Sequence, residues 1–231
     1  MGLIINENKT KYLQTNKDTK EKYIMIDNNY KFEKVKQFKY LGTIITNDNN
    51  MTREINTRIT MANKCYYGLK TQFQSRFLGI KAKCKLYKTL VRPILSYGSE
   101  SWTLIKENTD RLMIFERKVL RKIYGPVNDR GIWRIRNNNE IYNLYKEPNI
   151  IKVIKANRLR WLGHLHRSED NNPCKKVTFT DPLYLTRKVG RPATRWLDDV
   201  ENDLRALQVR NWKIEAKDRT RWRKIIGAVL A

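Results

Sequence analysis

The sequence predicts a mainly α-helical protein with a small β-rich piece at its N-terminus. Residues 1–46 contain short apolar runs bounded by Asn- and Asp-rich turns, a pattern typical of small strands. From residue 55 onward the apolar residues recur every three or four positions, which is the period of an amphipathic helix. With 231 residues, the chain can form one large domain or two small ones, each with a hydrophobic core.

The strands are expected in two apolar runs, residues 23–26 and 38–45, which together suggest two or three small strands. A second helix should cover about 80–92, with Pro93 kinking or ending it, and a third should run over about 110–124 and stop at Gly125. The first helix is expected from apolar residues spaced by 4, 3, 4, 3 and 4 positions, namely Ile55, Ile59, Ala62, Tyr66, Leu69 and Phe73.

The C-terminal half is also predicted to be helical. One helix is expected over 150–167, and a loop rich in Pro, Thr and basic residues should follow over 173–193. Two further helices should carry the apolar residues Trp196, Val200 and Leu204 and, separately, Ala216, Trp222 and Ile226.

The chain is strongly basic, with 48 Lys and Arg residues against 23 Asp and Glu residues and a net charge of +25. The excess is +3 over residues 1–50 but +7, +8 and +7 over 51–110, 111–170 and 171–231, so it is not a detachable basic arm. A folded body with this charge repels itself unless a polyanion neutralises it, which points to nucleic acid. No stretch approaches ~20 continuous apolar residues, which argues against a membrane partner.

The cysteines and the first residues of the chain give an expectation for the cellular compartment. Cys65, Cys84 and Cys174 are odd in number and far apart, which favours free thiols in a reducing compartment, nuclear or cytoplasmic. The first residues have neither a basic region nor a long apolar region, so no signal peptide is expected. They read as if the chain begins inside a domain.

Four blocks resemble the reverse transcriptases of LINE-type (non-LTR) retrotransposons, in the order found in that family. Residues 2–11, GLIINENKTK, resemble the palm block GLxINxxKTK, and residues 38–42, FKYLG, resemble the primer-grip block FxYLG. Residues 55–125, with LYKTLVRPILSYGSESW and FERKVLRKIYG, resemble the thumb and post-thumb helices. The blocks RLRWLGHLHR, GRPATRWLDDV and AKDRTRWR resemble the basic C-terminal region.

The resemblance implies a palm tail over 1–48, thumb and post-thumb helices over 49–130, and a basic helical nucleic-acid-binding region over 131–231. It implies RNA template and DNA primer or target as partners in target-primed reverse transcription, together with the palm and fingers of the parent polyprotein. The family's catalytic Asp pair, which holds two Mg²⁺ ions, is expected upstream of Gly2. This fragment is therefore expected to hold no cofactor and to be inactive alone.

Lys9 is the candidate catalytic residue that the resemblance suggests, because a palm lysine in this block can protonate the pyrophosphate leaving group as a general acid. Lys11 competes for that role, and both could instead be solvated lysines. In the primer-grip block, Gly42 would let the backbone approach a sugar–phosphate chain. Nucleic-acid contacts are expected from Phe38, Tyr40, Leu41 and Gly42. In a plain hairpin, Phe38, Tyr40 and Leu41 would lie in the core.

For residues 51–125 two interpretations compete: a helical bundle with a solvated basic face, and a thumb that clamps a duplex through phosphate contacts. The net charge favours the clamp, with candidate contacts at Arg58, Lys85, Lys88 and Arg121. Further along the chain, candidate contacts are Arg158, Arg160, His164 and Arg167, and Arg191 and Arg195 in an extended basic segment that could instead be a solvated linker. Trp161 is expected to be a core anchor.

Two other sites are disfavoured. Asp199 and Asp203 are expected on the outward, solvated face of a helix, which argues against a metal-dependent nuclease site there. His164, His166 and Cys174 could supply three zinc ligands, but a CxxC or HxxxH pair and a fourth ligand are missing. The two histidines also point ~200° apart on a helix. No metal site is expected, and the alternative function is a non-enzymatic DNA- or RNA-binding protein derived from such an element.

Overall fold

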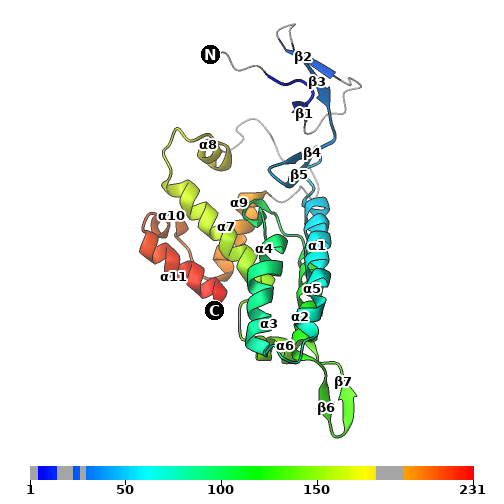
Figure 1. Ribbon diagram of the computed structural model, residues 1–231. Coiled ribbons are helices and arrows are strands. Elements are labelled where there is room, and N and C mark those ends of the chain that lie inside the picture. The colour runs from blue at the N-terminus through cyan, green and yellow to red at the C-terminus, as the bar shows by residue number, and fades with distance from the viewer. Residues whose placement is uncertain (1–4, 15–22, 27–29, 181–194) are drawn as a thin grey trace. The chain divides into compact units, whose positions relative to one another are not determined.

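The computed structural model describes residues 5–14, 23–26, 30–180 and 195–231. It is 62% helical with a few small strand pairs, so the predicted mainly α fold with a small N-terminal β piece is confirmed (Figure 1). The chain divides into two compact units, Met1–Thr57 and Arg58–Ala231, with the boundary inside helix α1. No helix among the described residues has the length and apolar character that crossing a membrane requires.

The first unit contains five short strands among its described residues, more than the two or three expected. Strand β3 (Tyr30–Lys34) is central in a three-stranded sheet, parallel to β1 (Lys11–Tyr12) and antiparallel to β2 (Tyr23–Ile26). Strands β4 (Gln37–Tyr40) and β5 (Thr43–Thr46) form a separate antiparallel hairpin.

The β4–β5 hairpin does not bury its aromatic tip. Leu41 and Gly42 form the two-residue turn with φ values of 47° and 85°, and Leu41 is 75% exposed. Tyr40 is also exposed and Phe38 is half-buried, so the alternative interpretation, in which these three side chains lie in the core, is wrong. Leu41 and Gly42 form the connection between the two strands, and such connections run over the protein surface.

Helix α1 crosses the boundary between the units, and the predicted stripe is divided between α1 and α2. Ile55, Ala62, Tyr66 and Phe73 are buried, whereas Ile59 and Leu69 are half-buried. The elements are α1 (Met51–Gly68), α2 (Lys70–Gln74), α3 (Ile80–Leu86), the π-helical turn η1 (Tyr87–Val91), α4 (Arg92–Leu95), the 3₁₀ turn η2 (Ser99–Ser101) and α5 (Lys106–Tyr124). Pro93 does not end the second helix, because it lies in the first turn of α4, where its missing N–H costs no helical hydrogen bond. Helix α5 stops at Gly125 as predicted, with φ at +70°.

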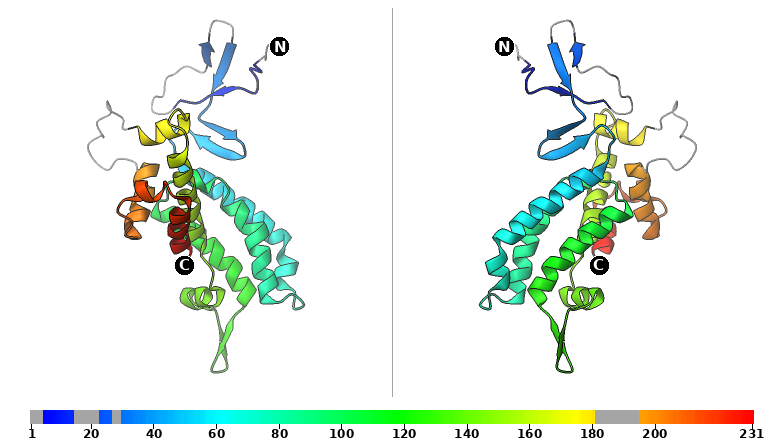
Figure 2. Two further views of the ribbon diagram at one scale, coloured as in Figure 1. Left: turned by 90° about the vertical axis from the view of Figure 1, so that its left-hand side faces the viewer. Right: turned by 90° about the vertical axis from the view of Figure 1, so that its right-hand side faces the viewer.

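A hairpin that was not predicted follows α5. Strands β6 (Val127–Asp129) and β7 (Ile132–Arg134) pair around Arg130 and Gly131, which both have positive φ. This hairpin projects from the helices of its unit (Figure 1; Figure 2). The positive φ values make a tight turn of the kind that joins antiparallel strands.

The remaining helices are α6 (Asn138–Tyr145), α7 (Ile150–Arg167), α8 (Pro173–Phe179), α9 (Trp196–Ala206), α10 (Trp212–Glu215) and α11 (Arg219–Leu230). Helix α7 has the predicted bounds. The first part of the predicted 173–193 loop is instead α8, because the Asn172 side chain caps it by accepting the Cys174 and Lys175 N–H groups. The rest of that loop, including Arg191, lies outside the described residues.

Helix α7 packs against α11 through Trp222, which was expected on the apolar stripe of the last helix. Trp222 is buried, and its Nε1 donates a 2.8 Å hydrogen bond to the Leu159 carbonyl. A Cβ at Gly163 would lie 2.2 Å from that Nε1. Trp161, by contrast, is only half-buried, so the expectation that it anchors the core is wrong. The glycine of the RLRWLGHLHR block is therefore required by packing.

Candidate nucleic-acid interface

Arg158 is fully buried and cannot contact a phosphate from this position. Its Nη2 lies 2.7 Å from Asp199 Oδ2 and its Nη1 lies 3.4 Å from Asp203 Oδ2, an ion pair without hydrogen bonds of good angular geometry. Lys155 Nζ adds a 2.8 Å contact to Asp203 Oδ1. The expectation that Asp199 and Asp203 face solvent is therefore wrong. A buried guanidinium needs carboxylate partners, and α9 supplies both of them.

The other predicted cations of the α1–α4 segment differ in their surroundings. Arg58 is buried, with its guanidinium carbon 4.4 Å from the centre of the Tyr97 ring. Lys88 is half-buried and forms a 2.7 Å ion pair with Glu147. Lys85 is exposed. Only Lys85 of these three combines exposure with the lack of an ion pair within the described part of the chain.

Arg121 lies in a group of cations at the C-terminal end of α5. Its Nε donates to the Arg136 carbonyl at 3.2 Å, and its Nη2 donates to Asn138 Oδ1 at 2.7 Å. These bonds fix the base of the β6–β7 hairpin. The surrounding cavity, called here the α5 pocket, has a volume of about 480 Å³ and is lined by Tyr66, Lys118, Arg121, Lys122, Gly125, Pro126, Ile135 and Arg136.

The α5 pocket is lined by four cations together with Tyr66, Pro126 and Ile135. Lys118 Nζ donates to Tyr67 Oη at 3.0 Å and to Asn63 Oδ1 at 2.9 Å, and it lies 4.6 Å from the centre of the Tyr67 ring. The neighbouring ammonium lowers the pKa of Tyr67 below its usual range. Within residues 58–180 and 195–231, no carboxylate forms an ion pair with Lys118, Arg121, Lys122 or Arg136. Beyond ion-pair distance, Arg136 helps to lower the pKa of Glu140.

The β6–β7 hairpin beside this pocket is rigid at its base and apolar on its surface. Arg134 forms hydrogen bonds of 3.0 and 2.7 Å with Glu140 and a 3.0 Å bond with Asp129. These bonds to Arg134, and then the backbone N–H of Asn137, lower the pKa of Glu140 to about 2. The exposed apolar side chains of the segment are Ile132, Trp133 and Ile135. Sequence reasoning missed this feature.

The polar side chains of the RLRWLGHLHR block, residues 158–167, lie in different environments. Arg160 is exposed and bonds to Asn157 on its own helix, while His164 is exposed with its ring 5.3 Å from that of Trp161. Arg167 is half-buried and donates to the Ala216 carbonyl at 2.6 Å. Burial lowers the pKa of Arg167. Arg167 therefore has a packing role as well as partial exposure.

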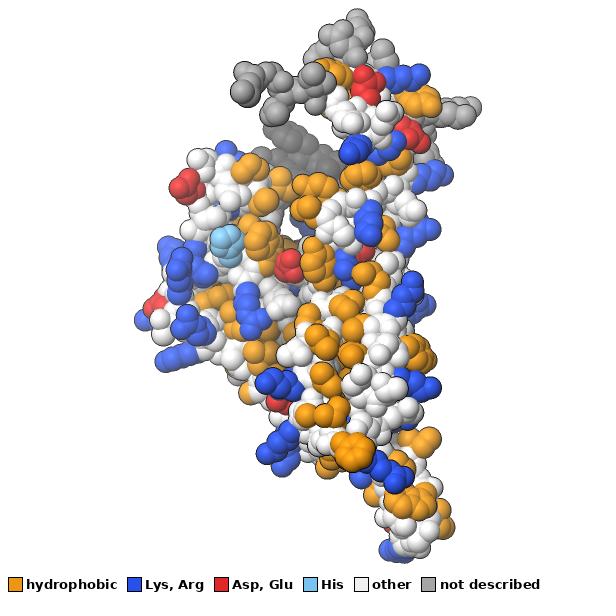
Figure 3. Space-filling model, in the orientation of Figure 1, with side chains coloured by type: hydrophobic (Ala, Val, Ile, Leu, Met, Phe, Trp, Pro, Cys, Tyr) orange, Lys and Arg blue, Asp and Glu red, His pale blue; other side chains and the backbone are white. Residues whose placement is uncertain are grey.

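A second group of exposed cations lies on α10 and α11, in the region expected to bind nucleic acid, although its residues were not among the named candidates. Between Trp212 and Lys224 the chain has six basic and two acidic residues, which is the signal that could have found it. Lys and Arg side chains gather over these helices in Figure 3. The exposed cations are Lys213, Lys217, Arg219, Arg221, Arg223 and Lys224, of which Arg221 lies near Glu215 and Asp218.

In the first unit, the two candidate lysines are distinguished by their partners. Lys11 Nζ is 2.6 Å from Glu33 Oε2, so its charge is compensated. Lys9 is exposed in a turn, where its backbone N–H donates to Asn6. The hairpin tip presents Tyr40, Leu41 and Gly42 at the surface. This geometry leaves Lys9 as the more available ammonium of the two.

The histidines and thiols do not converge on a metal site. His164 contacts Trp161, whereas the ring of His166 lies against Phe179 and Trp212. All three cysteines are free thiols. In the described part of the chain no three His, Cys, Asp or Glu residues are grouped to hold a metal ion.

Arg195, a predicted nucleic-acid contact, is exposed at the start of α9.

Comparison with known proteins gives an informative relative. No family model matches the chain, and no solved structure matches it. The chain is 28% identical over 233 residues to an uncharacterized transposon-derived protein of Caenorhabditis elegans, covering 98% of this chain and 83% of the relative. This similarity suggests that the chain has a transposon origin.

Proposed function

We propose that this chain is a part of the RNA-directed DNA polymerase of a non-LTR retrotransposon and that it holds the template–primer duplex during target-primed reverse transcription. The observation that carries the proposal is the α5 pocket, where Lys118, Arg121, Lys122 and Arg136 line one cavity and none has a carboxylate within ion-pair distance among the described residues. Duplex phosphates would supply the missing counter-charge, independently of sequence. The transposon-derived relative and the block order are consistent with it.

In this proposal the helices up to α5 act as the thumb and the exposed cations of α10 and α11 act as a second backbone-binding surface. The β4–β5 hairpin would be the primer grip, because Leu41 and Gly42 lie exposed at its turn. Lys9 would be the general acid for the leaving pyrophosphate, and the family's Mg²⁺ ions would be held by catalytic carboxylates outside this chain. Arg158 and Arg58 are left out of the interface, because both are buried.

The test is the binding of a labelled RNA–DNA hybrid duplex at several salt concentrations. Lys118→Gln with Lys122→Gln should weaken binding and should lower the slope of log K against log salt by ~0.9 for each phosphate that the variant no longer neutralises. The matched control is Arg111→Gln with Arg205→Gln, which changes net charge equally but removes cations that already pair with Glu107 and Glu201. An unchanged slope for the lysine variant would contradict the proposed interface.

The alternative is a non-enzymatic DNA- or RNA-binding protein derived from such an element. It needs the same nucleic-acid contacts, but the chain would take no part in DNA synthesis. We expect no dNTP incorporation on a primed RNA template by this chain alone with Mg²⁺, because the catalytic Asp pair is expected outside it. Adding the chain to a separately produced palm and fingers from the same element should restore extension. Extension that never depends on this chain would favour the alternative.

A further inference from the structure

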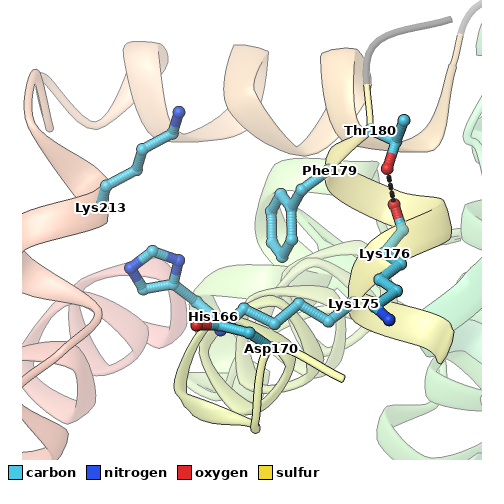
Figure 4. A pocket seen from close by; sticks show the side chains of 7 residues that line it. All are labelled: His166, Asp170, Lys175, Lys176, Phe179, Thr180 and Lys213. Carbon is cyan, nitrogen blue, oxygen red and sulfur yellow. Dashed lines mark hydrogen bonds and ion pairs between the residues drawn. The ribbon is translucent and has the colours of Figure 1, made fainter. Parts of the chain in front are cut away.

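A second cavity, called here the aromatic pocket, lies between the C-terminal end of α7, α8 and α10. Its volume is about 300 Å³, which is at the small end of ligand pockets. Figure 4 shows the rings of His166 and Phe179 facing the same space, with Lys213 on one side and Lys176 on the other. The lining residues are His166, Asp170, Lys175, Lys176, Phe179, Thr180 and Lys213.

The aromatic walls are held in place by a buried tryptophan behind them. The Phe179 and Trp212 rings are stacked with centroids 6.2 Å apart, and the His166 ring meets Trp212 edge-on at 5.3 Å. Trp212 is itself fixed, because its Nε1 donates to Glu201 Oε1 at 3.1 Å and its ring lies 6.4 Å from that of Trp222. The planar surfaces of this pocket are therefore organised before any ligand arrives.

His166 presents a neutral ring to the pocket. Burial lowers its pKa below the ordinary value of 6.5, and the nearby cations Lys175, Lys217 and Lys213 lower it further. A hydrogen bond to the Lys213 backbone opposes this shift. At neutral pH the imidazole is thus an uncharged aromatic surface, suitable for stacking on another planar ring.

The lysines around the pocket differ in their hydrogen-bond and ion-pair partners. Lys175 Nζ is held by the Ser168 carbonyl at 2.7 Å and by Asp170 Oδ1 at 2.8 Å. Lys176 and Lys213 are exposed, and neither forms an ion pair with a described carboxylate. The His166 and Phe179 rings meet edge-to-face, with centroids 6.0 Å apart and an interplanar angle of 80°, so a base would stack on the open face of one ring. Two exposed ammonium groups thus flank an aromatic surface, an arrangement that suits a planar base with a phosphate attached.

We propose that the aromatic pocket receives one unpaired base of a single-stranded nucleic acid, with its phosphate between Lys176 and Lys213. This inference rests on the proposed nucleic-acid-binding function and adds a strand-specific site to it. A duplex does not fit, because a paired base cannot enter a 300 Å³ cavity without leaving its stack. The cations favour a polyanion over a neutral or apolar ligand.

The experiment compares a fluorescein-labelled single-stranded dodecamer with an RNA–DNA hybrid of equal length, using the full chain. Phe179→Leu keeps an apolar side chain against Trp212 but removes the aromatic face, so single-strand affinity should fall roughly tenfold while hybrid affinity stays unchanged. Lys176→Gln, at an exposed position, should lower the single-strand salt slope by ~0.7. Val177→Ala, exposed on the same helix, is the control and should change neither.

The outcomes separate the two proposals. A fall in single-strand affinity in both pocket variants, with intact hybrid binding, supports the site. Equal single-strand affinity in the wild type and both variants overturns it, as does a wild type that binds the hybrid but no single strand. Displacement of the single strand by an acidic peptide of equal charge at equal concentration would also overturn it. A wild type that binds neither nucleic acid overturns the proposed function itself.

Discussion

Helix α7 is held by two buried polar clusters that compensate charge in different ways. Near its N-terminus, Glu116 of α5 is fully buried and accepts hydrogen bonds from Tyr87 Oη at 2.9 Å, Tyr142 Oη at 3.2 Å and the Ile150 backbone N–H at 3.0 Å. Burial raises the pKa of Glu116 above its ordinary value, and these hydrogen bonds oppose the shift. In this cluster the buried carboxyl group accepts all three hydrogen bonds from uncharged donors.

Two turns further along α7, in the second cluster, a buried cation is neutralised by carboxylates. Arg158 is as buried as Glu116, yet Asp199 and Asp203 from α9 neutralise it, and Asp199 also accepts the Leu104 N–H at 2.9 Å. In a chain of net charge +25, this arginine is paired with carboxylates, whereas the α5 pocket cations have no carboxylate within ion-pair distance among the described residues, and Lys118 and Arg121 donate to neutral acceptors instead. The difference teaches that compensation, and not the number of cations, separates a structural arginine from the cations that we propose bind nucleic acid.

Arg158→Met should give the largest stability loss, about 3–5 kcal/mol in the free energy of unfolding, because it leaves the poorly hydrated Asp199 without its cation and Asp203 with Lys155 alone. Urea unfolding measures it. Arg160→Met, on the exposed side of the same helix, should change stability by less than ~0.5 kcal/mol. Adding Asp199→Asn to Arg158→Met should recover part of the loss. Equal losses for Arg158→Met and Arg160→Met would contradict the assigned ion pair.

Glu116→Leu should cost about 3 kcal/mol, because each buried donor left unpaired costs ~1–3 kcal/mol and the Tyr87 hydroxyl is deeply buried. Thermal unfolding with circular dichroism would report this loss. Leu144→Ala, at an exposed position of α6, is a control that should change stability little.

Glu116→Gln tests the charge of the first cluster through pH. The folded-state pKa of Glu116 is raised above 4.5, so the folded state holds the proton more tightly than the unfolded state. This group therefore contributes its full stability below pH 4.5, and the contribution is lost as the pH rises through the raised pKa. The stability of the wild type relative to Glu116→Gln should fall across that window. A difference that rises with pH would refute the assignment.

A pair of glycine substitutions tests the third attachment of α7, to α11, and has the smallest effects. Gly163→Ala should destabilise by about 1–3 kcal/mol, because its Cβ would overlap Trp222. Gly227→Ala on α11 has open space around the added Cβ and should stabilise by about 0.5–1 kcal/mol through helix propensity. Urea unfolding of the two variants measures both signs. Similar effects of the two substitutions would argue against the Gly163–Trp222 contact.

Much of the secondary structure follows from local pattern. The bounds of α7, the end of α5 at Gly125 and the helices that carry Val200, Leu204 and Ile226 agree with the periodic apolar stripes and the glycine stop signal. The α8 helix and the β6–β7 hairpin were missed, because a short helix with an Asn cap and a turn with positive φ at Arg130 give weak apolar periodicity.

The sequence by itself determined the mainly α fold, the helix positions and the excess of positive charge, because these depend on residue type and on spacing along the chain. Only the tertiary structure decided which cations are compensated. A helical wheel places Arg158 within the apolar stripe of Ile151, Ile154, Leu162 and Leu165, whereas Arg160 lies on the opposite side. The carboxylates that compensate Arg158 come from α9, 41 and 45 residues later. Which side chains of a neighbouring helix meet a buried cation is a long-range packing outcome, and no local pattern contains it.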